Sequence, residues 1–154
     1  MVATRRADTT FASPSVSGSR PVMLATFNVP FEPEAATVAV DAAAETGQPL
    51  LVVNIAETPI LPVSMRLGYE YLETPELTSA LRSPAELAAS LGLDVEILRV
   101  ASPRPVDALL QLVAERSPGL LVVGPAHGAL GRRRYARTAR RIRERATCLL
   151  WLSA

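Results

Sequence analysis

The part of the chain best suited to chemistry is a glycine-rich turn that follows the apolar run Leu120–Val123. Gly124, Gly128 and Gly131 stand here with His127 among them, and a stretch of arginines comes directly after. Glycines at the end of a strand let backbone N–H groups approach phosphate oxygens, and the start of a following helix favours negative charge. The pattern predicts an anion-binding turn, and the alternative is a tight strand-to-helix turn that binds nothing. A Walker loop is excluded because the chain contains no lysine.

The arginines after this turn make the charge distribution uneven. The span 21–131 holds five arginines and thirteen acids, or −8, whereas 132–145 holds eight arginines and one acid, or +7. Such a basic helix could follow nucleic-acid phosphates, but no aromatic residues are interleaved for base stacking. Nucleic acid is therefore not expected as a partner, and a solvated face balanced by acids elsewhere is favoured. The arginines of the stripe, at steps of three and four, are Arg134, Arg137, Arg141 and Arg145.

No catalytic or metal centre is expected. His127 and Cys148 are the only histidine and the only cysteine. The predicted helix between them separates the two side chains, so a nucleophile with its base is improbable. A zinc site needs three or four ligands, which this pair cannot supply. We therefore expect no enzyme and no metal, and interpret Cys148 as a small buried apolar residue.

Five short apolar runs, too short for helices and rich in valine, leucine and isoleucine, predict strands buried on both faces. They are Val22–Phe27, Leu50–Ile55, Val95–Val100, Leu120–Val123 and Cys148–Leu152. Helical stretches lie between them. Pro33 begins one that ends before Gly47, Pro105 begins one that runs to Arg116, and the last covers about 133–146. A capping box at Ser83–Glu86 predicts a short helix up to Gly92.

This alternation predicts an α/β fold: a parallel sheet with helices on both faces, joined by right-handed crossovers. Residues 1–20 lack periodicity and are interpreted as a disordered tail, so that 21–154 form a single domain. The segment from Glu57 to Leu81 is expected to be a long irregular connection with one possible short helix starting at Thr74. No apolar run approaches the roughly 20 residues of a membrane span, and no secretory signal follows Arg5 and Arg6, so a cytoplasmic protein is expected.

From Pro21 to Leu152 the chain resembles the universal stress protein family. The resemblance rests on the five strands, the long connection after the second, the Val-Val-Gly turn before the last helix, and the final strand Cys148-Leu-Leu-Trp-Leu. It implies a three-layer, doubly wound sandwich with a five-stranded parallel sheet in the order 3-2-1-4-5, of the adenine nucleotide alpha hydrolase-like kind. The last strand commonly forms the dimer contact in this family, which implies a homodimer through Cys148, Leu149, Leu150, Trp151 and Leu152.

Family members that bind ATP carry glycine, two residues, glycine, nine residues, then glycine and serine or threonine. In this pattern Gly124 matches the first glycine and Thr138 the final hydroxyl residue. His127 stands at the second glycine, with Gly128 beside it, and Arg137 replaces the third. Phe27 or Asn28 replaces the aspartate at the end of the first strand. The candidate nucleotide-binding residues are Thr26, Asn28, Asn54, Ile55, Gly124, His127, Gly128, Gly131, Arg137 and Thr138.

The resemblance therefore implies a dimeric regulatory or interaction module of the stress response, without intact ATP binding and without a cofactor, that acts on protein partners. The alternative is an adenine-nucleotide-binding stress protein that holds ATP with Mg²⁺ through Gly124, Gly128 and Thr138, with at most slow hydrolysis.

Overall fold

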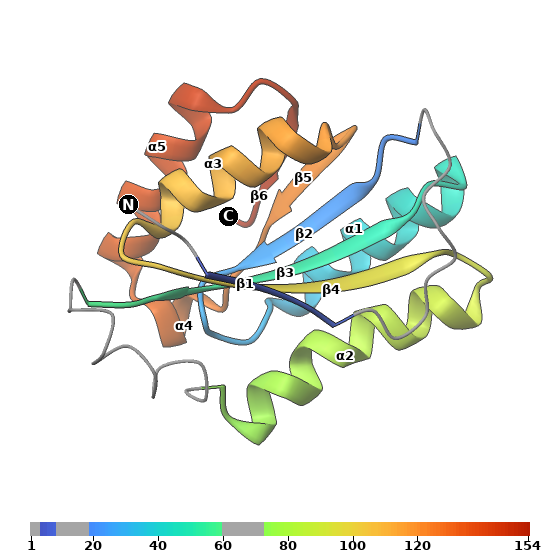
Figure 1. Ribbon diagram of the computed structural model, residues 1–154, viewed down its shortest axis with the longest axis horizontal. Helices are drawn as coiled ribbons and strands as arrows, with labels where there is room; N and C mark the ends of the chain where they lie inside the picture. The colour runs from blue at the N-terminus through green and yellow to red at the C-terminus, as the bar shows by residue number, and fades with distance from the viewer. Residues whose placement is uncertain (1–3, 9–18, 60–72) are drawn as a thin grey trace.

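The computed structural model describes residues 4–8, 19–59 and 73–154. Its strands form one six-stranded sheet in the order β1-β4-β3-β2-β5-β6 (Figure 1). The five strands from β2 to β6 run parallel, and counted from β2 their order is the predicted 3-2-1-4-5. The α/β fold class is thus confirmed. The strands are β1 Thr4–Asp8, β2 Val22–Thr26, β3 Leu50–Glu57, β4 Val95–Ser102, β5 Leu120–Val123 and β6 Leu149–Leu152.

The extra strand β1 corrects the prediction that residues 1–20 lack structure. It pairs antiparallel with β4, with Thr4 opposite Ala101 and Asp8 opposite Ile97. Its sequence, TRRAD, has no apolar run. A polar segment of this kind forms a strand only when the backbone of an existing edge strand supplies its hydrogen bonds. The rest of the predicted tail, 1–3 and 9–18, lies outside the described residues.

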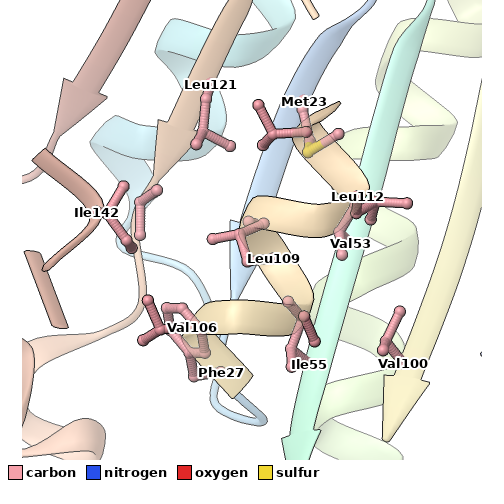
Figure 2. Packing of buried hydrophobic residues seen from close by; sticks show 14 of the residues in the cluster. Met23, Phe27, Val53, Ile55, Val100, Val106, Leu109, Leu112, Leu121 and Ile142 are labelled. Atoms are coloured by element: carbon pink, nitrogen blue, oxygen red, sulfur yellow. The ribbon is translucent and has the colours of Figure 1, made fainter. Parts of the chain in front are cut away.

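Helices cover both faces of the sheet (Figure 1). On one face α1 and α2 pack on alternate strand residues such as Leu24 and Val52. On the other, α3 and α5 pack on the intervening residues, such as Met23 and Val53. Figure 2 shows this second cluster, with α3 contributing side chains to its centre. The helices are α1 Pro33–Thr46, α2 Pro75–Ser90, α3 Pro105–Arg116, α4 His127–Leu130 and α5 Arg132–Arg145.

Helix α2 differs from the predicted short helix at Ser83. It begins at Pro75, where the Thr74 side chain accepts a hydrogen bond from the Leu77 N–H at 3.2 Å, so the possible start at Thr74 is confirmed. Pro84 lies inside the helix and is buried. A proline resembles a helix start in sequence, yet burial of its side chain offsets the cost of a proline within the helix. None of the described helices is long and apolar enough to cross a membrane.

Candidate functional site

The predicted turn after β5 lies against the loop that joins β2 to α1. The Gly124 N–H donates to the Ala25 carbonyl at 3.2 Å, and the Glu32 N–H donates to the Gly124 carbonyl at 2.9 Å. The Ala126 N–H donates to the Pro30 carbonyl at 2.8 Å. Both loops leave the carboxyl ends of neighbouring parallel strands, which is where ligands bind in open α/β sheets. The turn therefore stands at the predicted place in the fold.

Gly124 is required by the packing of α1. A Cβ added to it would lie 2.0 Å from the Ala35 Cβ. No such contact is possible between carbon atoms, so the glycine allows α1 to lie against the end of β5. The space that the missing Cβ of Gly124 leaves is therefore occupied by Ala35 of α1 and not by a ligand.

Three contacts hold His127, one through its backbone N–H and two through its ring. Its backbone N–H donates to Glu32 Oε1 at 2.9 Å. Its ring lies 4.1 Å, centroid to centroid, from the Tyr135 ring, and its Nε2 lies 2.9 Å from Ser153 Oγ. The Tyr135 hydroxyl in turn donates to the Ser153 carbonyl at 2.7 Å. This His127–Tyr135–Ser153 cluster joins the turn after β5, helix α5 and the segment that follows β6.

The two residues at the end of the predicted motif lie away from the turn. Helix α5 already begins at Arg132, directly after Gly131, whose φ is 92°. Arg137 and Thr138 consequently lie inside the helix, with Arg137 exposed and Thr138 half-buried. Gly128 is exposed within α4, and a Cβ there would meet nothing within 4 Å.

The residues predicted at the ends of the first two parallel strands form a hydrogen-bonded group. The Asn28 N–H donates to Asn54 Oδ1 at 2.8 Å, and Asn54 Nδ2 donates back to Asn28 Oδ1 at 3.3 Å. Asn28 has a φ of 59°, a left-handed conformation that asparagine tolerates better than most residues. The Thr26 hydroxyl donates to the Val29 carbonyl at 2.6 Å. Ile55 is fully buried in the α3–α5 core, where it cannot meet a ligand.

A cleft of about 440 Å³ opens beside this group. Of the ten predicted nucleotide-binding residues, only Asn28 lines it. The ion pair between Arg134 and Glu57 also lines the cleft, with Nη2 and Oε2 2.5 Å apart and both side chains about half exposed. Glu57 ends β3, and Arg134 stood out in the sequence only as a member of the arginine stripe. The lining residues are Phe27, Asn28, Val29, Glu57, Thr58, Pro59, Ala129, Leu130 and Arg134.

Three arginines of the predicted stripe pair with acids on other elements. Arg134 pairs with Glu57, while Arg141 and Arg145 both pair with Asp107 of α3, at 3.3 and 2.6 Å. Asp107 is in the first turn of α3, where a negative charge also suits the helix dipole. The two acids balance two of the three positive charges on this side of the basic helix from within the chain.

The predicted dimer strand β6 is an edge strand that pairs, among the described strands, with β5 alone. Leu149 is 71% exposed, and Leu150, Trp151 and Leu152 are half-buried. Cys148, just before the strand, is also half-buried, and its burial raises the pKa of the thiol above its ordinary value of 9.0. The described residues contain no group of three or more His, Cys, Asp or Glu side chains that could hold a metal ion.

The layered sheet, with its loops gathered at the carboxyl ends of β2, β3 and β5, defines a nucleotide-binding-like α/β protein. The chain belongs to the universal stress protein family, whose model matches residues 18–152. No curated protein matches the chain.

Solved structures show the same fold. The universal stress protein UspA from Lactobacillus plantarum superposes with a TM-score of 0.63 at 15% identity, over 90% of this chain and 100% of that one. A universal stress protein in complex with cAMP has a TM-score of 0.58 at 23% identity, over 90% and 99% of the two chains. A family member from Arabidopsis thaliana with AMP bound has a TM-score of 0.55 at 15% identity, over 86% and 90%.

Proposed function

We propose that this universal stress protein does not hold ATP through the turn after β5 and acts as a homodimeric regulatory module of the stress response. The observation that carries the proposal is the hydrogen bond from the His127 N–H to the Glu32 carboxylate. A phosphate placed at this amide would meet a carboxylate, and two negative charges in contact repel each other. The chain's own anion thus stands where the phosphate would bind.

Two further features support the absence of ATP. The side of Gly124 that lacks a Cβ is filled by Ala35. Helix α5 begins at Arg132, so Thr138 is within the helix and its hydroxyl is not at a helix start. The residues that the resemblance assigns to the phosphates and ribose are therefore divided between the turn and the interior of α5, which supports a site without ATP.

Calorimetric titration of the nucleotide-stripped protein with MgATP tests this proposal. We expect no measurable heat of binding up to about 1 mM ATP, equivalent to a binding free energy weaker than about −4 kcal/mol. Micromolar binding by the wild type would overturn the proposal. Glu32→Ala removes the internal carboxylate, and a gain of binding in this variant would identify Glu32 as the reason. Glu34→Ala, an exposed acid in the first turn of α1, is the matched control.

The regulatory dimer is supported by the exposed edge of β6. An edge strand carries unpaired backbone N–H and C=O groups that can pair with another copy, and Leu149 adds exposed apolar surface there. Sedimentation velocity tests the dimer. Leu149→Arg should give a monomer, whereas Leu87→Arg, which changes a 53% exposed leucine on α2, should leave the dimer intact. A wild type that sediments as a monomer both with and without multivalent anions in the buffer would remove this part of the proposal.

A second function is favoured by the cleft at the ends of β2 and β3. Its volume lies in the range of small-molecule sites, and a phosphate group there would compete with Glu57 for the half-exposed guanidinium of Arg134. Two similar structures hold cAMP and AMP. Under this alternative the protein binds an adenine monophosphate in place of ATP. Titration with AMP and cAMP tests it, and Arg134→Gln should abolish any binding observed.

A further inference from the structure

The exposed arginines of α5 divide into rows that face different directions. Tyr135, Ala139 and Ile142 form the buried row, at steps of four and three. Arg134, Arg141 and Arg145 lie on one side of it and pair with Glu57 and Asp107. At 100° per residue, Arg132, Ala136 and Arg143 fall on the other side of the buried row. We call these three residues the edge-side row.

The edge-side row points toward the open edge of the sheet. The paired row faces α3 and the end of β3, both toward the centre of the sheet. The opposite flank of the helix must therefore face the β6 side. Arg132, Ala136 and Arg143 are all exposed, and the described part of the chain offers no acid to either arginine. Residues 147–154 contain no charged side chain.

A dimer through β6 would bring two such rows together. Antiparallel pairing of two edge strands continues the sheet across a two-fold axis perpendicular to it, and residues on the same face of both copies then adjoin. The two α5 helices would lie on one face in opposite directions. Arg132 of each copy would thus approach Arg143 of the other copy, which makes two such contacts across the axis. Four guanidinium groups without acids would then repel each other across the axis.

From this charge arrangement we infer that a multivalent inorganic anion, of the oligophosphate class, binds between the two α5 helices at the two-fold axis and controls dimerisation. The inference rests on the proposed β6 dimer. Guanidinium groups bind phosphate oxygens in a bidentate manner, and an anion that touches both copies binds the dimer better than the monomer. Mass action then makes dimerisation depend on the anion concentration.

The test is sedimentation equilibrium of the full chain at low ionic strength, with and without 1 mM sodium tripolyphosphate, a concentration chosen to be about tenfold above a moderate affinity. We expect tripolyphosphate to lower the dimer dissociation constant by about tenfold, while sodium chloride at equal ionic strength gives a smaller change. Arg132→Gln with Arg143→Gln should dimerise without the anion and lose the response. Arg133→Gln with Arg137→Gln makes the same charge change elsewhere on α5 and should keep it.

The outcomes separate the two proposals. A protein that stays monomeric in every condition overturns the β6 dimer, and the anion site with it. A dimer that forms equally well with and without tripolyphosphate leaves the β6 dimer standing and overturns the anion site. Equal responses of the two double variants would also overturn it, because the binding would then come from the overall charge of α5.

Discussion

The side chain of Asn54 makes two hydrogen bonds with Asn28. Its Oδ1 accepts from the Asn28 backbone N–H at 2.8 Å, and its Nδ2 donates to the Asn28 side-chain Oδ1 at 3.3 Å. Asn54 is almost fully buried, on β3, while Asn28 follows β2 with a φ of 59°. The pair therefore fixes a left-handed residue at the carboxyl ends of two neighbouring strands. It sets the shape of one wall of the cleft.

Removing this support should destabilise the protein. Asn54→Ala leaves the Asn28 N–H without its partner, and we expect a loss of about 1–3 kcal/mol in the free energy of unfolding. Chemical denaturation followed by circular dichroism measures it. Asn28→Gly is the comparison: it loses only the longer hydrogen bond from Asn54 Nδ2, keeps the backbone donor and adopts this φ freely, so we expect a smaller loss. An Asn54→Ala protein as stable as the wild type would show that the pair has no structural role.

Two glycines of the turn should respond oppositely to alanine. Gly124→Ala places a Cβ 2.0 Å from that of Ala35, and we expect a loss of about 1–3 kcal/mol or more in unfolding free energy. Gly128→Ala meets nothing and adds helix propensity, so it should be neutral or stabilising by about 0.5–1 kcal/mol. Thermal unfolding of both variants measures the difference. Adding Ala35→Gly to Gly124→Ala should restore part of the loss, whereas no restoration would contradict the steric explanation.

The apolar strands, the polar strand β1 and Pro84 show how far the fold could be predicted. The runs at β2, β3 and β5 are continuously apolar because both faces of these strands are buried, and this pattern is local and readable. The strand β1 is polar and forms through its pairing with β4, which no local pattern records. Proline occurs more often at helix starts than in helix interiors, so the position of Pro84 within α2 depends on its burial in the folded protein.

The candidate site was less predictable for the same reason. The family spacing matched Arg137 to a ligand position, although the helix predicted over about 133–146, and found as α5 Arg132–Arg145, already contained it. The contact between Glu32 and His127 joins residues 95 positions apart, and the sequence around either residue contains no pattern that predicts it. Glu57 and Arg134 likewise meet only because the ends of β3 and α5 come together in the fold.

The ion pair between Glu73 and Arg99 should stabilise the start of α2. Arg99 Nε and Nη2 donate to the two Glu73 oxygens at 2.6 and 3.0 Å, and both side chains are only 15–20% exposed. Glu73→Gln leaves a largely buried guanidinium with a weaker partner, and we expect a loss of about 1–3 kcal/mol in denaturant unfolding. The exposed pair of Arg140 and Glu144 provides the control, since Glu144→Gln should change stability by less than about 0.5 kcal/mol. Equal effects of the two substitutions would contradict this prediction.

Cys148 should make stability fall at alkaline pH. Burial raises the pKa of its thiol above 9.0, so the unfolded chain loses this proton at a lower pH than the folded protein does. The unfolded state then binds fewer protons, and unfolding becomes more favourable as pH rises. The contribution of Cys148 is fully present below about pH 9 and is lost above it. Unfolding curves between pH 7 and 10 for the wild type and Cys148→Ala should diverge only in the alkaline range, and parallel curves would refute the prediction.

The two edges of the sheet differ in chemistry. At one edge β1 presents the sequence TRRAD, in which three of five residues are charged, and at the other β6 presents LLWL. Charged edge strands resist pairing with further chains, whereas apolar ones permit it. Growth of a fibril needs both edges to accept a neighbour, because each added copy must offer a fresh surface for the next. If β6 pairs with a second copy as proposed, the sheet of the dimer ends in two β1 strands, and a third copy finds no apolar edge to join.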